Sequence, residues 1–236
     1  MLFQRFFSVD SPKAVKAQKY GWLNAINYMA PHRLAGVGNL CPHASKGCVA
    51  ICLGEHSGNA ALYPAVLKSR IAKARLLMRD RQAFLKEMTA GVRRARATAK
   101  HQKLKLCVRL NGATDIAWER LAPAIFADNA DLKFVDYTKS PKRAIEHAQG
   151  KLPANYHLTF SRSETNEDDC RRVLAAGGNV AVVFAGEFPE HYLGHRVING
   201  DAHDLRHLDG RGVVVALSPK GRNAKSDKSG FVVRSC

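Results

Sequence analysis

Three of the six cysteines of this 236-residue chain lie close together, at Cys41, Cys48 and Cys52. A thiolate is a soft ligand that is stabilised when a metal neutralises it, so three neighbouring thiols predict one metal centre. A helix over Val49–Leu53 would place Cys48 and Cys52 on one face, because residues four apart are neighbours on a helix surface. Pro42 and Gly47 favour turns, and they would bring Cys41 round to meet the other two cysteines.

The spacing leaves the metal open between an iron–sulfur cluster and zinc. Structural zinc normally takes four ligands, commonly as two close pairs, whereas this chain has one triplet that His43 or His56 could complete. Three cysteines with a fourth position free suit a four-iron, four-sulfur (4Fe-4S) cluster whose remaining iron binds another ligand. The sequence therefore favours the iron–sulfur cluster. Zinc is the alternative metal, and three small buried cysteines without a metal are a further alternative.

The length predicts a single α/β domain over 1–236, in which residues 1–32 cover one end of the fold. Gln4 and Arg5 interrupt the apolar N-terminal stretch before it reaches the length of a signal peptide, and no later run approaches a membrane span. We therefore expect a cytoplasmic protein with no membrane partner. The other cysteines, Cys107, Cys170 and Cys236, are too scattered to indicate a disulfide framework.

Positive charge is concentrated in a basic helical segment, residues 60–100. The chain has 37 Lys and Arg against 20 Asp and Glu, a net charge of +17, and 13 of the basic residues fall between Lys68 and Lys105. An apolar stripe of helical period runs through the segment, and Asp80 is placed to cap a second helix. The opposite face is either a solvated surface or a phosphate-binding one. The nucleic-acid candidates on it are Arg70, Lys73, Arg93, Arg94, Arg96 and Lys100.

From residue 104 onward, apolar strands alternate with helices, which predicts βαβ units and a parallel sheet. The expected strands are 33–40, 104–110, 133–138, 156–160, 180–184 and 213–217, and the expected helices are 115–127, 141–149 and 167–176. A dinucleotide-binding fold would carry a G-x-G-x-x-G motif after its first strand, and none is present. The pattern therefore favours a partial or complete TIM-like barrel with the three-cysteine loop after the first strand.

Polar residues recur where the predicted strands end. In a β/α barrel these ends form the ligand site, and the cysteine loop would reach the same face. The ligand-binding candidates are Arg109, Asn111, Asp115, Asp136, Thr138, Ser161, Arg162, Ser163 and Glu164. Asp136 is the strongest candidate, because an acid inside an apolar strand must either have hydrogen-bond or charge partners or take part in function. The alternative for the others is ordinary turn and helix-cap chemistry.

Taken together, these segments resemble a phage family, gene product 88. The resemblance is carried by C-P-x-A-S-x-G-C-x3-C from Cys41 to Cys52, by 109–116, 136–139, 156–161 and 179–184, and by 229–232. It implies a phage or mobile-element origin and hence the cytoplasm of a bacterial host. More distantly, the three-cysteine loop resembles radical S-adenosylmethionine enzymes. That resemblance implies a four-iron cluster on Cys41, Cys48 and Cys52 whose open iron binds the amino and carboxylate groups of S-adenosylmethionine.

The sequence thus predicts an iron–sulfur protein, and our first hypothesis is a radical-type enzyme that acts on a nucleotide or nucleic acid and takes an electron from a donor partner. The rival hypothesis is a non-catalytic iron–sulfur or zinc protein that binds nucleic acid through the basic helical segment.

Overall fold

A computed structural model describes residues 3, 5–56 and 58–234. Its helices are α1 (Pro12–Gln18), α2 (Lys46–Ala50), α3 (Gly58–Leu62), α4 (Pro64–Arg79), α5 (Arg81–His101), α6 (Trp118–Leu121), α7 (Ala124–Ala127), α8 (Pro141–Ala148), α9 (Glu167–Ala175), η1 (Arg206–Leu208) and α10 (Arg222–Lys225). Its strands are β1 (Trp22–Ile26), β2 (Lys105–Arg109), β3 (Lys133–Thr138), β4 (Tyr156–Ser161), β5 (Asn179–Ala185), β6 (His191–Tyr192), β7 (His195–Asn199), β8 (Val214–Leu217) and β9 (Val232–Arg234). Within these residues no helix is long and apolar enough to cross a membrane.

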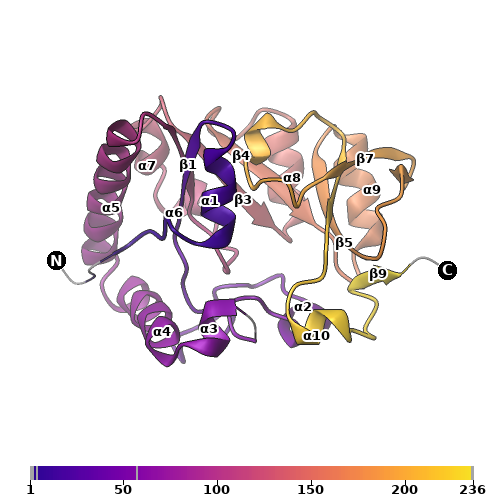
Figure 1. Cartoon of the computed structure of the whole chain (residues 1–236), viewed down its shortest axis with the longest axis horizontal. Helices are drawn as coiled ribbons and strands as arrows, with labels where there is room; N and C mark the ends of the chain where they lie inside the picture. The colour runs from indigo at the N-terminus through magenta and orange to yellow at the C-terminus, as the bar shows by residue number, and fades with distance from the viewer. Residues whose placement is uncertain (1–2, 4, 57, 235–236) are drawn as a thin grey trace.

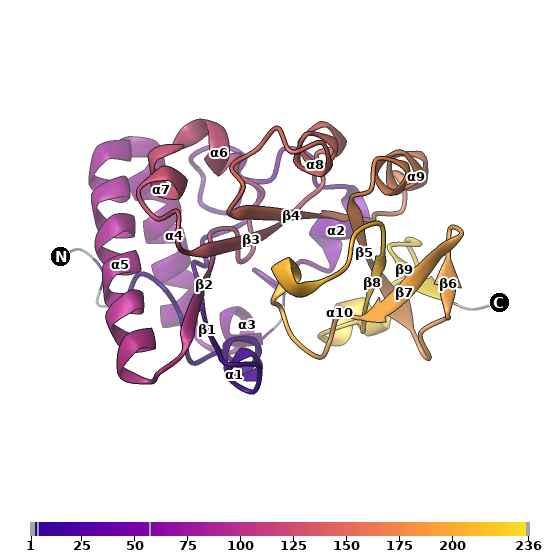
Figure 2. The ribbon, with the colours of Figure 1, turned by 90° about the horizontal axis from the view of Figure 1, so that it is seen from above.

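The strands form one mostly parallel sheet, which confirms the predicted α/β class (Figure 1). The order is β1-β2-β3-β4-β5-β8-β7-β6, β9 also pairs with β5, and β6–β7 is an antiparallel hairpin. The sheet bends into an arc but is not closed, so the expected complete barrel is wrong (Figure 2). β1 forms one edge of the sheet, and the β6–β7 hairpin forms the other.

The first strand is earlier than predicted. Residues 33–40 form turns and bends, in which Gly36 and Gly38 have φ of 70° and 120°, so the expected strand there is wrong. These backbone angles suit glycine and interrupt an extended strand. The sheet begins instead with β1, whose Leu23 and Ala25 are fully buried. The N-terminal segment expected to cover the fold therefore contributes a strand to the sheet.

Helices cover the convex side of the arc (Figure 2). Asp80 separates α4 from α5 as predicted, and its side chain accepts a hydrogen bond from the Ala83 amide at 2.9 Å. The predicted helix over 115–127 is instead two short helices, α6 and α7, because Pro123 interrupts the helical hydrogen bonding between them. The core on this side contains Phe84, Trp118, Phe134 and Tyr156.

The concave side is filled by the segment that carries η1. Leu205 packs with Cys107 and Val135 of β2 and β3, and η1 contacts β3 and β4. The carboxyl ends of the parallel strands remain available to the loops that follow them.

Candidate functional site

The three cysteines lie on the connection between β1 and α3, which passes over the carboxyl ends of the strands. The thiol of Cys41 accepts a hydrogen bond from the His32 amide at 3.3 Å and donates to the carbonyl oxygen of Ala113, beyond β2, at 3.7 Å. Farther along, α2 lies beside α10 near the other end of the chain, where Asn223 donates to the Ala50 carbonyl at 3.2 Å (Figure 1). Loops from both ends of the sheet thus hold the cysteine connection.

The helix in this connection is α2, which begins one turn earlier than expected. Ser45 caps it, since its hydroxyl accepts a hydrogen bond from the Cys48 amide at 3.1 Å. Cys52 lies beyond the helix, in a turn closed by hydrogen bonds from its amide to the Val49 carbonyl and from His56 to its own carbonyl. The expected pairing of Cys48 and Cys52 on one helical face is therefore wrong.

Glu164, which follows β4, fixes the start of α2. Its carboxylate accepts hydrogen bonds from the Ser45 hydroxyl at 2.7 Å and from the Gly47 amide at 2.8 Å. These bonds, together with the positive charge of Lys139, lower the pKa of Glu164 although partial burial opposes them. Gly47 is required by the close approach, because an added Cβ would lie 2.7 Å from Glu164 Oε2. This contact explains the glycine before Cys48.

The three thiols are half-buried, free of disulfides, and close enough to affect one another electrostatically. Burial raises the pKa of Cys41 to about 12 and that of Cys52 to about 11, and the neighbouring thiols add to both shifts. No group of three or more His, Cys, Asp or Glu side chains in the described residues is arranged to hold a metal ion. The three thiols are suitable ligands for a soft metal or cluster, and the positive charge of that group would lower their pKa values. They are not already arranged around a metal position in this structure.

Asp136 and Asn111, two of the predicted site residues, bind each other. The Asp136 carboxylate accepts hydrogen bonds from the amide and side chain of Asn111 at 2.7 and 3.1 Å and from the Tyr156 hydroxyl at 2.9 Å. Burial raises the pKa of Asp136 to about 7, although these donors and the nearby arginines oppose the shift. Asp136 is thus satisfied within a structural network, which explains an acid in an apolar strand.

Asp115 and Thr138 contact a cation that the sequence did not single out, Arg143 of α8. Arg143 is 4 % exposed and donates to Asp115 at 2.7 Å, to Thr138 at 3.0 Å and to Glu119 at 2.7 Å. A basic residue on an amphipathic helix gives no sequence signal that it will be buried. The three acceptors show that this arginine joins β3 to the loop after β2.

Among the candidates at the end of β4 and after it, some contact residues near the cysteine connection, and others form hydrogen bonds only within their own turn. Ser161 accepts a hydrogen bond from the Lys139 ammonium at 2.7 Å, and that ammonium lies 5.1 Å from the ring of Phe231, which packs near Cys48. Arg162 donates to the carbonyls of 230 and 231. Ser163 is buried in a turn, where its amide donates to Asn166 at 2.6 Å.

A cavity of about 680 Å³ opens beside Cys52, between the N-terminal segment, α4 and the ends of β1 and β2. Its lining includes Tyr28, Leu53, Arg70, Lys73, Arg109 and Lys220. Arg109 is held on its wall by Asp204 at 3.1 Å, over the ring of Tyr137. Asp10 is the carboxylate among the described lining residues, and it pairs with Arg5. Lys220 and Arg109 pair with Asp201 and Asp204, so among the described lining residues Arg70 and Lys73 are the cations without a carboxylate partner.

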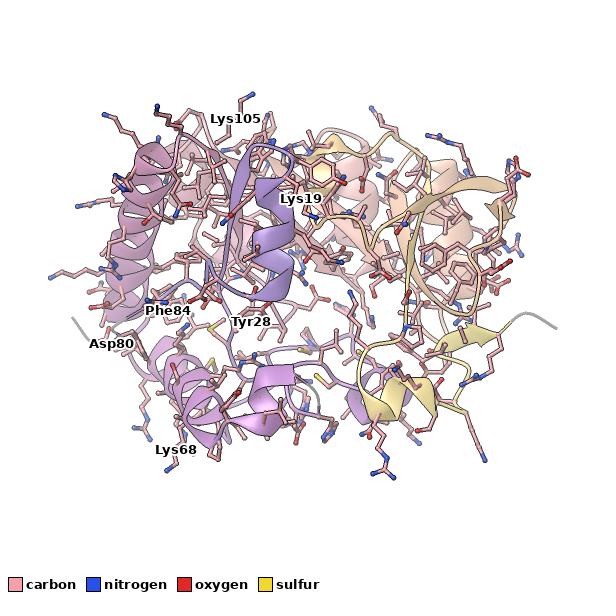
Figure 3. The ribbon with its side chains drawn as sticks, viewed as in Figure 1. Lys19, Tyr28, Lys68, Asp80, Phe84 and Lys105 are labelled. Carbon is pink, nitrogen blue, oxygen red and sulfur yellow. The ribbon has the colours of Figure 1, made fainter. Side chains whose placement is uncertain are left out.

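Arg70 joins this cavity to the cysteine connection. It is 7 % exposed, donates to the Gly54 carbonyl at 2.8 Å, and lies 4.7 Å from the ring centroid of Tyr28. Burial lowers the pKa of Arg70, while Tyr28 and Cys52 act in the opposite direction. Figure 3 shows Tyr28 between α1 and the layer of α3 and α4.

The basic helical segment does not present all its charges on one surface. Lys68 projects outward from α4 (Figure 3), but Arg70 and Lys73 are buried, so their predicted placement on an exposed phosphate-binding face is wrong. Lys73 donates to the Phe6 carbonyl at 2.6 Å, and burial lowers its pKa to about 8. On α5, Arg93 and Lys100 are exposed, Arg94 and Arg96 are partly exposed, and Arg96 pairs with Asp131.

Comparison with known proteins identifies a family. A model of the family described as Gene product 88 matches residues 5–235. No curated protein and no solved structure matches the chain. Because the family match spans nearly the whole sequence and agrees with the motifs around the cysteines and strand ends, the chain belongs to the Gene product 88 family.

Proposed function

We propose that Cys41, Cys48 and Cys52 hold an iron–sulfur cluster and that the adjacent cavity binds the anionic ligand on which the cluster acts. The observation that carries the proposal is the position of Arg70. Its guanidinium donates to the carbonyl oxygen of Gly54, two residues after Cys52, at 2.8 Å and also lines the cavity, so a ligand bound there would lie near the cysteine connection. Three soft thiolate donors without a fourth cysteine in the same connection favour iron–sulfur over zinc.

The composition of the cavity supports an anionic ligand of nucleotide size. Its volume of about 680 Å³ falls within the range of small-molecule sites. Arg70 supplies a planar guanidinium group that suits carboxylate or phosphate, and Tyr28 supplies an aromatic face, whereas Arg109 already donates to Asn111, Gly112 and Asp204. S-adenosylmethionine is the first ligand to test, since it combines a carboxylate for Arg70 with an aromatic base, although its sulfonium and ammonium groups give the whole molecule a net positive charge.

When bound, a three-cysteine cluster supplies one-electron chemistry at its open iron, with the electron delivered by a donor protein. The chain itself would bind and orient the ligand through Arg70. Leu53, the residue after Cys52, and Tyr28 line the cavity and would contact the ligand there.

Metal content tests the cluster. Anaerobically purified protein should contain iron and sulfide in near-equal amounts, and Cys48→Ala should lose both. Cys170→Ala is the matched control, because Cys170 lies on α9, buried in a cluster with Phe160 and Val182 and outside the cysteine connection, so this variant should keep both. Stoichiometric zinc without iron in the wild-type protein would contradict the proposal.

Turnover tests the ligand. The reduced protein should cleave S-adenosylmethionine to methionine and 5′-deoxyadenosine, with the electron supplied by the added reductant and the hydrogen atom taken from an organic substrate or the buffer. A fully loaded, reduced protein that neither binds nor cleaves it would leave the cluster in place but exclude S-adenosylmethionine as its ligand.

A second candidate function is nucleic-acid binding, supported by the exposed cations of α5. Lys86, Arg93 and Lys100 are exposed and follow one another at intervals of seven residues, which places them along one side of the helix. A row of cations can contact successive phosphates without reading sequence.

A further inference from the structure

A second cavity, of about 300 Å³, shares no lining residue with the first. It lies between the end of α4, α6 and the start of α8, and Pro42 and His43 of the cysteine connection form part of its wall. The function proposed above assigns it no role.

Positive charge converges on this cavity. Four basic side chains line it, Arg81, Arg120, Lys142 and Arg143, against one carboxylate, Asp115. Asp115 is already occupied, because it accepts hydrogen bonds from Arg143 at 2.7 Å and from the Lys139 amide at 2.8 Å. Among the described residues, neither Arg81 nor Lys142 has a carboxylate partner. Arg120 pairs with Glu146, and Arg143 pairs with Asp115 and Glu119, so Arg81 and Lys142 are the two lining cations that a bound anion would neutralise.

The start of α8 adds oriented backbone donors. Pro141 has no N–H group, and the first helical hydrogen bond from Ala144 returns to Ser140, so the amides of Lys142 and Arg143 have no partner within the helix. The first turn contains no acidic residue and places two cations at the positive end of the helix dipole. A bound anion would offset that repulsion and accept both amides.

Ser140 supplies an independent observation. It is 6 % exposed and lines the cavity, yet its hydroxyl neither caps α8 nor makes another hydrogen bond to the described residues. The hydroxyl oxygen itself keeps contact with solvent, so in this cavity it is open to a ligand beside the free amides of Lys142 and Arg143.

The rest of the wall is apolar. Leu40, Leu77, Met78, Ile116 and Leu121 line it, and Met78 is 52 % exposed at its edge. Methionine adapts to flat or irregular surfaces and contacts aromatic rings favourably. We infer that this cavity binds a phosphate group attached to an aromatic body, as in a nucleotide. The inference goes beyond the proposed cluster and does not depend on it.

Calorimetric titration of the wild-type protein, with and without iron, tests the inference. Adenosine monophosphate should bind with the same affinity in both preparations, and adenosine should bind at least about tenfold more weakly because it lacks the charged acceptor. Inorganic phosphate should compete. Equal affinity for adenosine and adenosine monophosphate, or no binding of any phosphate probe at millimolar concentration, would overturn it.

Variants locate the site. Lys142→Glu should abolish binding of adenosine monophosphate and Ser140→Ala should weaken it several-fold, while Lys151→Ala, an exposed lysine beyond the end of α8, should not change it. Thermal unfolding of each variant checks that it is folded. If folded Lys142→Glu and folded Ser140→Ala both bind adenosine monophosphate as tightly as the wild type, the ligand does not bind in this cavity.

A short oligonucleotide titrated in parallel distinguishes the two sources of such a phosphate. Tighter binding of the mononucleotide identifies a free nucleotide, and tighter binding of the oligonucleotide that is lost in Lys142→Glu identifies a nucleic-acid strand. Both outcomes support the site.

Discussion

The backbone amide of Gly47 donates a hydrogen bond to the carboxylate of Glu164 at 2.8 Å, so the residue before Cys48 is fastened to the end of β4, 117 residues later. This contact holds α2 over the sheet. It makes the position of Cys48 depend on a strand from the opposite half of the chain.

Replacing Glu164 with Ala should loosen the cysteine connection. The variant loses the acceptor for Ser45 and Gly47, and hydrogen bonds to a charged group each contribute about 1.5–3 kcal/mol. We expect a lower free energy of unfolding in urea and faster hydrogen exchange at the Gly47 amide. Glu187→Ala, at an exposed glutamate, is the control and should leave both unchanged. Protection of Gly47 retained in Glu164→Ala would contradict the role of this contact.

Gly47→Ala should have a related effect through crowding. The added methyl would lie 2.7 Å from Glu164 Oε2, and overpacking of this kind typically costs about 1–3 kcal/mol. We expect reduced stability and reduced iron retention after desalting. Gly210→Ala provides the matched control, because a Cβ there meets its nearest atom at 3.9 Å. Equal iron retention in the two variants would argue against a constrained site.

Asp136 should make stability depend on pH. Its folded-state pKa of about 7 exceeds the unfolded value of about 4, so the folded chain holds this proton longer and the contribution to stability falls as pH rises from about 4 to about 7. Asp136→Asn has no proton to lose. The difference in unfolding free energy between wild type and variant should therefore change steadily over that interval and level off above it. A constant difference would show that Asp136 is already ionised near pH 4.

The exposed side of α5 gives a prediction for nucleic-acid binding. Charge reversal at Arg93 and Lys100 together should weaken binding to duplex DNA and reduce the slope of log K against log salt by about 1.8, since each lost phosphate contact accounts for about 0.9. Charge reversal at exposed Lys19 and Lys151, on other elements, is the control. Equal slopes for the two double variants would exclude the α5 surface.

The alternating strands and helices after residue 104 were predictable because each strand carries its own apolar pattern. β3 occupies the predicted 133–138, and Asp80 caps α5 as expected. Closure of the sheet was not predictable in this way. Closure depends on whether the two edge strands pair with each other. The edges are β1, which contains the polar Asn24, and the short β6–β7 hairpin, and neither has a sequence pattern that identifies it as an edge.

The sequence could predict which residue types form the candidate site, but not which other residues each of them contacts. The cysteines and polar strand ends could be chosen from spacing alone. Whether a polar group faces the cavity or the covering helices is decided by strand register, which places Arg109 on the cavity wall and Asp136 against Tyr156. The burial of Arg70, Lys73 and Arg143 arises from long-range packing, so a count of charges along the helices could not reveal it.

Electron paramagnetic resonance of the anaerobically reduced protein tests the central claim most directly. The account predicts an iron–sulfur signal in the wild type and in Cys170→Ala that disappears when Cys41, Cys48 or Cys52 is replaced by Ala. Reduced wild-type protein with no iron signal and one zinc per chain, or a signal that survives all three replacements, would contradict it.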